Sequence, residues 1–119
     1  TRGFELKAGD LSPIEIDPAT LGHVHDTLDG LQVETAADSA RLIRAALEGD
    51  DDVASIKARS IIALNAGAGI YVSGVTESLA SGIAAAEQAI ASGAAIQKLE
   101  AFVAFTQDLP EKQGGAPAL

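Results

Sequence analysis

The sequence predicts an α+β fold in which a β-hairpin is followed by four mostly antiparallel helices. Apolar and polar residues alternate one by one in the first 17 residues, which is the period of a half-buried strand. From residue 35 onwards, apolar residues recur every three to four positions, which is the period of an amphipathic helix. Capping residues and glycines divide this second region into four segments.

The hairpin is predicted from the stretch GFELKAGDLSPIEID, where the three residues AGD supply the turn. Phe4 and Leu6 alternate with charged residues before the turn, and Ile14 and Ile16 do so after it. We therefore expect these four residues to form one apolar face. Because an isolated two-stranded hairpin is only marginally stable in water, that face should pack against a sheet or a helix layer.

Capping residues predict the bounds of the first two helices. After an irregular connector with one or two helical turns, Thr35 is the expected N-cap of the first helix, with Asp38 in its first turn and Gly49 just past its end. Its apolar stripe is Leu42, Ile43, Ala46 and Leu47. The acidic run 50–52 begins a second helix that Gly74 ends. The predicted stripe of this helix is Val53, Ile56, Ser60, Ile61, Leu64, Ala68, Tyr71 and Val72.

The last two helices are predicted from shorter patterns. Thr76 is the expected N-cap of the third helix, which ends at the Ser-Gly pair 92–93; Leu79, Ile83, Ala86 and Ile90 should face inward. The fourth helix should bury Ile96, Leu99, Phe102, Val103 and Phe105. Residues 110–119 have no period and are predicted to be disordered, which leaves residues 1–109 as one folded unit.

Composition excludes several classes of partner. The formal net charge is −9 and the eight basic residues are scattered, so we expect neither nucleic acid nor an anionic membrane as a partner. No apolar run approaches the roughly 20 residues of a membrane span. The chain has no cysteine, which is compatible with a cytoplasmic location, and it begins at Thr1 with no methionine. The sequence is thus expected to be processed or a piece of a longer protein.

The segment NAGAGIYVSG, residues 65–74, resembles a phosphate-binding loop in composition but not in context. A phosphate loop lies between a strand and the start of a helix, whereas Gly67 and Gly69 fall three turns into a helical pattern. Each interior glycine costs about 1 kcal/mol of helix propensity relative to alanine. We expect both glycines to permit close packing against another backbone, and we expect Asn65 to be buried.

The remaining polar residues do not form a catalytic or metal-binding pattern. His23 and His25 lie in one polar connector without a third histidine or a cysteine, so we expect them to be solvated rather than to bind metal. The acidic run 48–52 lacks the spacing of a calcium loop. No nucleophile has a histidine partner. From the residues alone we expect no catalytic, substrate-binding or metal-binding residue in this chain.

Several stretches resemble the C-terminal part of the anthranilate phosphoribosyltransferase family. LNAGAGIYVSG followed by SLASGIAAAEQAIASGAAIQKLEAF is similar to the family pattern L-N-A-x-A-x-[LI]-Y-V-A-G, S-L-x-x-G-x-x-x-A-x-x-x-I-x-S-G-x-A-x-x-x-L. TRGFELKAGDLSPIEIDPATLG resembles the family's hairpin, T-x-V-x-E-L-x-x-G-x-I. The resemblance covers residues 1–109. One departure is VETAADSA in place of G-D-P-x-E-N-A, which leaves Ser39 where the family has asparagine and puts any role of that asparagine in doubt.

The resemblance implies a function for a longer protein. It implies that this chain belongs to the larger α/β domain of a phosphoribosyltransferase and supplies scaffold to it. The intact enzyme would transfer the phosphoribosyl group from phosphoribosyl pyrophosphate to anthranilate, in tryptophan biosynthesis, as a cytoplasmic homodimer that uses magnesium. The family's G-T-G-G-D loop, its K-H-G-N segment and its magnesium-binding Asp–Glu pair precede the hairpin and are absent from this sequence. The chain alone is therefore expected to be inactive, with the N-terminal remainder of the enzyme as its partner.

Two alternatives stay open at this point. One is a nucleoside phosphorylase or another relative with the same fold, which would use a different acceptor. The other is a helical interaction module without catalysis, in which an exposed apolar patch would recruit a partner.

Overall fold

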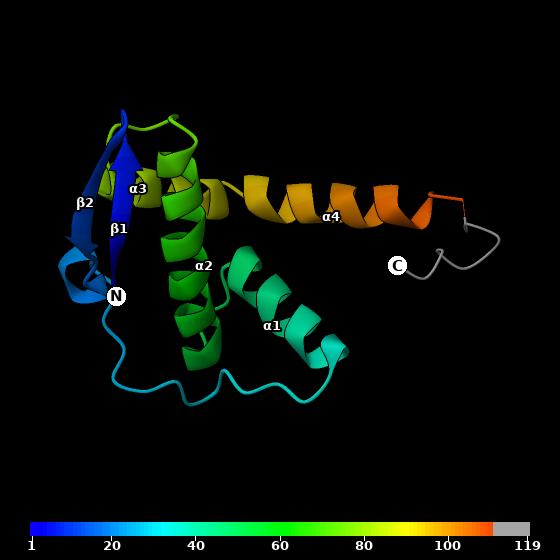
Figure 1. Cartoon of the computed structure of the whole chain (residues 1–119). Helices are drawn as coiled ribbons and strands as arrows, with labels where there is room; N and C mark the ends of the chain where they lie inside the picture. Colours follow the sequence, from blue (N-terminus) through cyan, green and yellow to red (C-terminus); the bar gives the residue numbers. More distant parts are fainter. Residues whose placement is uncertain (111–119) are drawn as a thin grey trace, which may run out of the picture.

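The computed structural model describes residues 1–110, and they form the predicted hairpin and four helices. Strands β1 (Arg2–Lys7) and β2 (Asp10–Glu15) form an antiparallel sheet, and a short 3-10 helix, η1 (Pro18–Leu21), follows. The helices are α1 (Ala36–Glu48), α2 (Val53–Val72), α3 (Leu79–Ala91) and α4 (Ala94–Gln107). Figure 1 shows α2 at the centre, with the hairpin on one side and α1 on the other. Of the tail predicted over 110–119, residues 111–119 lie outside the described part of the chain.

The hairpin turn is one residue shorter than the predicted AGD turn, and this changes the register. Ala8 and Gly9 alone connect the strands, with φ angles of 52° and 87°, the positive values that a two-residue type I′ turn requires. Phe4 consequently pairs with Pro13, and Gly3 pairs with Ile14. A shift of one residue moves a side chain to the opposite face of a sheet. The prediction of a single apolar face was therefore wrong.

The hairpin instead has two different faces. Its inner face carries Gly3, Glu5, Ile14 and Ile16, all of them partly buried. Its outer face carries Phe4, Leu6 and Leu11, whose exposed fractions are 72%, 72% and 67%. The inner face lies toward α2, while the outer face leaves large apolar side chains in contact with solvent.

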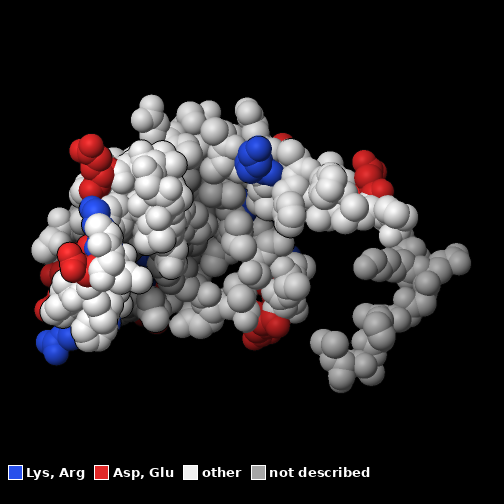
Figure 2. Space-filling view, turned by 45° about the horizontal axis from the view of Figure 1, so that its top comes forward, with Lys and Arg blue, Asp and Glu red and all other residues white. Residues whose placement is uncertain are grey.

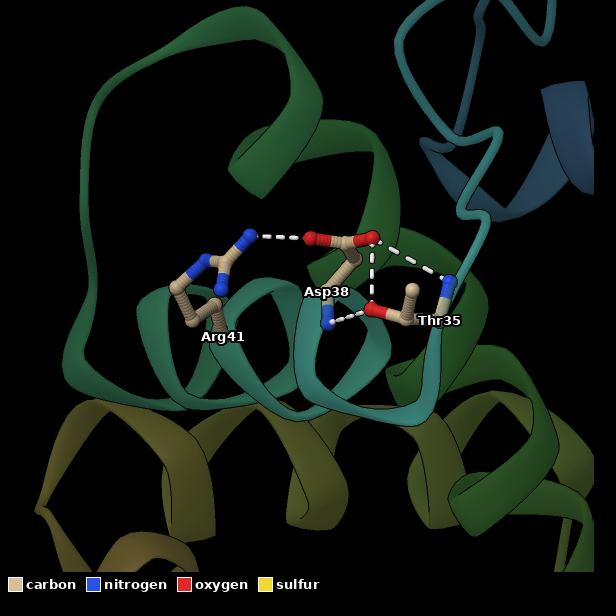
Figure 3. A network of polar contacts seen from close by, with 3 residues as sticks. All are labelled: Thr35, Asp38 and Arg41. Carbon is tan, nitrogen blue, oxygen red and sulfur yellow. Dashed lines mark hydrogen bonds and ion pairs between the residues drawn. The ribbon is translucent and has the colours of Figure 1, made fainter.

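Helix α1 begins and ends where the sequence predicts. Thr35 and Asp38 form a capping box: the Thr35 hydroxyl accepts from the Asp38 backbone N–H at 3.1 Å, and the Asp38 carboxylate accepts from the Thr35 backbone N–H at 3.1 Å. The same carboxylate accepts from the Thr35 hydroxyl and from Arg41 (Figure 3). Gly49 closes the helix in the left-handed conformation at φ 90°.

The caps of α2 and α3 confirm one prediction and correct another. Asp52 caps α2 and accepts from the Ser55 backbone N–H at 3.0 Å. Helix α3 is capped by Ser78 rather than by Thr76, because Ser78 and Ser81 exchange side-chain and backbone hydrogen bonds as a capping box. Thr76 lies two residues earlier and donates its hydroxyl to the Ser78 carbonyl at 3.3 Å.

Helices α2 and α3 cross at two glycines. A Cβ atom added to Gly67 would lie 2.5 Å from the Ile83 Cα, and one added to Gly82 would overlap the Gly67 carbonyl oxygen. Glycine at both positions therefore lets the two backbones touch. Gly69 was predicted to do the same, but it is exposed and has no atom within 4 Å of such a Cβ.

The core is made of small residues on α2 and larger ones on its neighbours. Leu47, Ala63 and Ile90 form the buried cluster, and Ile62, Ala95, Ile96 and Leu99 pack against it. The buried residues of α2 are Ser55, Ala58, Ala63 and Gly67. The large residues of its predicted stripe lie outside the core; Val53 and Val72, for example, are 66% and 83% exposed. The period alone could not tell which face of this apolar helix meets α3.

Helix α4 contributes less to the core than predicted. It has no fully buried residue, and both Phe102 and Phe105 are exposed. Its axis bends by 72° from that of α3, so this pair is not antiparallel, and its far end extends away from the other helices (Figure 1). Within residues 1–110, no single helix is long and apolar enough to cross a membrane. The bent pair of α3 and α4 together reaches the length and apolar composition of such a span.

The two interior glycines of α2 should respond in opposite ways to a methyl group. Gly67→Ala should lower the free energy of unfolding by roughly 1–3 kcal/mol, because the Cβ forces the helices apart. Gly69→Ala should raise it by up to about 1 kcal/mol, because this open helical position gains only propensity. Urea denaturation of the two variants beside the parent chain measures both changes. Equal decreases in the free energy of unfolding of the two variants would contradict the helix crossing at Gly67.

The caps of α1 and α2 should make stability depend on acid. Hydrogen bonds from Thr35 to Asp38, helped by Arg41, and from Ser55 to Asp52 hold the pKa of each carboxyl below its ordinary 3.8. A group with a lowered pKa stabilises the fold above its ordinary value and loses that contribution as pH falls through the folded value. The urea concentration at the unfolding midpoint, measured between about pH 2 and 6, should therefore decrease once the pH falls below 3.8. Thr35→Ala should make this drop smaller, and an unchanged drop would rule out the Thr35 contribution.

Candidate functional site

A large hollow lies between the hairpin and the end of α2. This hairpin groove has a volume of about 930 Å³ and is lined by both hairpin strands, by the last turns of α2 and by the start of α3. Ile14 and Ile16 of the hairpin and Tyr71 and Leu79 of the helices are among the residues that line it. Its size lies within the range of small-molecule sites.

Three polar side chains join the hairpin to α2 across this groove. The Tyr71 hydroxyl donates to the Glu5 carboxylate at 2.5 Å. Lys7 donates to the same hydroxyl at 3.4 Å, and its ammonium lies 5.4 Å from the centre of the Tyr71 ring. The lysine thus adds a cation–π contact to a weak hydrogen bond. Residues 64 to 66 positions apart in the sequence are brought together here.

This cluster joins the hairpin to the end of α2. The hydroxyl of Tyr71 uses its hydrogen on Glu5 and one lone pair on Lys7. Glu5 and Tyr71 belong to TRGFEL and IYVSG, two separate stretches of the resemblance. The hydrogen bond between them gives a structural reason for the presence of both residues.

A second hollow surrounds His23. This His23 hollow has a volume of about 340 Å³ and lies where the connector meets the ends of α1 and α3 and the first half of α2. The His23 side chain is only 8% exposed, and its Nε2 lies 3.3 Å from Glu87 Oε1. That distance is in ion-pair range, but the alignment forms no hydrogen bond, so Nε2 has no partner.

The prediction of solvated histidines is wrong for His23 but holds for His25, which is exposed. His23 is buried against α3, and His25 Nε2 lies 2.8 Å from the Ser60 hydroxyl of α2. Each anchors the connector to a different helix. In residues 1–110, no three His, Cys, Asp or Glu side chains are placed to hold a metal ion.

Asn65 also differs from its prediction. It is exposed, and its amide donates to the Ile61 carbonyl of its own helix at 2.9 Å. The period could not show this, because Asn65 sits on the face of α2 that turns away from α3. The acidic run 48–52 serves the helices, since Glu48 ends α1 and Asp52 caps α2.

Sequence reasoning missed the Glu5–Tyr71–Lys7 cluster. A weak signal was present: Tyr71 is the only tyrosine of the chain and stands at the end of an apolar helix, where a buried hydroxyl usually needs a partner. Nothing in the sequence indicated that its partners lie in the hairpin. On the face shown in Figure 2, acidic and basic side chains lie together at the left edge, the rest is mostly uncharged, and no basic patch is visible.

Comparison with known proteins gives one family and a consistent set of relatives. The profile described as "Glycosyl transferase family, a/b domain" matches residues 1–96. An anthranilate phosphoribosyltransferase of Teredinibacter turnerae is 47% identical over 102 residues, and one of Saccharophagus degradans is 46% identical over the same length; each match covers 86% of this chain and 30% of the relative. One of Cellvibrio japonicus is 46% identical over 109 residues, which is 92% of this chain and 32% of that relative.

These relatives are much longer than the chain described here. The chain spans about 30% of the length of the curated relatives that it matches first.

The tyrosine contact can be tested by removing one oxygen atom. Tyr71→Phe should lower the free energy of opening the hairpin by about 1 kcal/mol, the net value of one hydrogen bond. Hydrogen exchange at the β1 amides measures this opening. Glu5→Ala should have a similar effect that does not add to the first, because both variants remove the Glu5–Tyr71 hydrogen bond. Glu15→Ala, on the outside of the same hairpin, is the matched control and should change little. Additive effects of the first two variants would disprove the contact.

Proposed function

The chain belongs to the glycosyl transferase family with the a/b domain, and on that premise we propose that it is part of an anthranilate phosphoribosyltransferase. The observation that carries the proposal is identity of 46–47% to enzymes of that name over at least 86% of the chain. Such an enzyme would transfer the phosphoribosyl group of phosphoribosyl pyrophosphate to the amine of anthranilate, as a step of tryptophan biosynthesis.

We propose that this chain supplies scaffold to that enzyme, as its C-terminal part. The described polar side chains cap helices or join elements, as the Glu5–Tyr71 bond and the Thr35–Asp38 box do. The reacting groups would come from the remainder of the enzyme. Exposed apolar side chains support this division, because contiguous apolar surface marks sites that another part of a protein covers. Among them are Phe4, Leu6 and Leu11 on the hairpin and Phe102 and Phe105 on α4.

Magnesium, if the enzyme uses it, would bind outside this chain. The residues described here do not fit a metal site, since no three candidate ligands converge in residues 1–110. We propose that acidic residues elsewhere in the enzyme hold the ion. We also propose a cytoplasmic homodimer, and the absence of cysteine is compatible with that location.

A chimeric enzyme tests the proposal. The matched segment of the Teredinibacter turnerae relative is replaced by the corresponding 102 residues of this chain. Loss of anthranilate fluorescence in the presence of phosphoribosyl pyrophosphate and magnesium measures turnover. Activity should stay within about tenfold of the parent enzyme, an increase of less than about 1.4 kcal/mol in activation free energy. The 119-residue chain alone should show none.

Two variants of the chimera separate scaffold from active site. Gly67→Ala should reduce the amount of folded enzyme but leave KM unchanged, and Gly69→Ala should behave as the parent chimera. Turnover by the 119-residue chain alone would refute the scaffold role. A chimera that folds but transfers no phosphoribosyl group would count against the proposed activity.

A further inference from the structure

The His23 hollow has features that the scaffold role does not explain. Its floor is apolar and includes Ile56, Ala63 and Ile90. Its rim is charged, with Glu48 from α1, Arg59 from α2 and Glu87 from α3. A concave apolar floor with a few polar groups is the general form of a small-molecule site, and about 340 Å³ suits a small ligand.

His23 presents an unused polar atom to this hollow. Its side chain is more than nine-tenths buried, and Nε2 has no hydrogen-bond partner. In the tautomer with the proton on Nδ1, Nε2 and the facing Glu87 oxygen are both acceptors 3.3 Å apart. A buried polar atom without a partner costs free energy, so a donor that reaches both atoms would be stabilised there.

The charge around the hollow favours a positively charged donor. The two carboxylates of Glu48 and Glu87 outnumber the single guanidinium of Arg59. Arg59 is also engaged, since it donates to the Asp50 carbonyl of the loop between α1 and α2 at 3.1 Å. Helix α1 ends at Glu48 and helix α3 ends at Ala91, so both direct the negative ends of their dipoles toward this region.

An organic cation fits better than a metal ion. His23, Glu48 and Glu87 line one hollow, but in the described residues 1–110 no three such side chains are close enough to ligate a metal. A primary ammonium group has three N–H donors and can reach acceptors that are further apart than metal ligands. The apolar floor would accommodate the rest of such a molecule.

We propose that the His23 hollow binds a small primary amine in its ammonium form. The ammonium donates to Glu87 and to Nε2 of His23, and Glu48 adds negative charge. The apolar part of the ligand lies against Ile56 and Ile90. This site is separate from the hairpin groove, and it gives the chain a ligand of its own beyond its part in phosphoribosyl transfer.

Benzylamine is a suitable probe, with benzyl alcohol and benzoate as neutral and negatively charged analogues of similar shape. Each is titrated into the 119-residue chain while the backbone amide signals of Gly49 and Ala91 are followed by NMR. We expect saturable shifts with benzylamine and a Kd in the millimolar range, as for a fragment of about eight non-hydrogen atoms. Benzyl alcohol and benzoate should bind at least about tenfold more weakly, since charge-assisted hydrogen bonds are the stronger ones.

A pair of charge-neutralising variants locates the site. Glu87→Gln should weaken benzylamine binding about tenfold, and the fold is retained because the Glu87 side chain is already half exposed. Glu34→Gln makes the same change on an exposed connector residue outside the hollow and should leave binding unchanged. His23→Leu, checked by circular dichroism, should also weaken binding.

Each of the other results would overturn the proposal. Equal binding of benzyl alcohol would mean that the hollow recognises only apolar shape. Equal losses in Glu87→Gln and Glu34→Gln would mean that the net charge of −9 attracts amines without a site. Zn²⁺ binding that Glu87→Gln abolishes, without benzylamine binding, would assign the hollow to a metal. The absence of any saturable shift would leave no amine site.

Discussion

The crossing of α2 and α3 at Gly67 and Gly82 is the constraint on which the other contacts depend. Two helices normally pack with their axes 8–10 Å apart because side chains separate them. Here Gly67 and Gly82 have no Cβ atom, so the backbones touch and Ile83 lies directly against Gly67 of α2. Ala63, one turn earlier on α2, packs in the core cluster with Ile90 of α3. The glycines cost helix propensity, and the close contact that they permit offsets it.

This crossing determines what the outer elements can do. Because α2 uses its small residues on α3, its large apolar residues and its single tyrosine remain for other surfaces. Tyr71 reaches the hairpin through Glu5, and Leu47 of α1 and Ile96 of α4 complete the core around Ala63 and Ile90. The hairpin and the far end of α4 stay at the periphery with exposed aromatic side chains. A packed core with exposed apolar side chains at its edges agrees with the proposed role as a scaffold segment of a larger enzyme.

The two hollows have different relations to the proposed enzyme. The hairpin groove is bordered by two separate stretches of the family resemblance, and its polar residues Glu5, Lys7 and Tyr71 contact one another. The His23 hollow contains a buried nitrogen without a partner, which makes it the better candidate for a ligand. Its charged residues come from the end of α1, the first half of α2 and the second half of α3, and His23 comes from the connector. The fold therefore places a polar site at a point where no motif indicated one.

The sequence by itself determined the features that depend on residues within four positions of each other. The capping box of Thr35 and Asp38, the start of α2 at the acidic run 50–52 and the end of α1 at Gly49 follow from local hydrogen bonds, and the inward residues Ile83, Ala86 and Ile90 follow from the period of α3. Only the tertiary structure decided the hairpin register, the buried face of α2 and the surroundings of His23. A two-residue turn instead of a three-residue one moves Ile14 to the other face, and the alternation of residues is the same in both cases. Apolar residues lie on nearly all sides of α2, so its sequence does not show which face contacts α3. The packing of the two backbones places Gly67, and not Gly69, at that contact. His23 is buried because residues from three helices, up to 68 positions away in the sequence at Ala91, close around it. Such contacts depend on how distant segments pack, which no local pattern specifies.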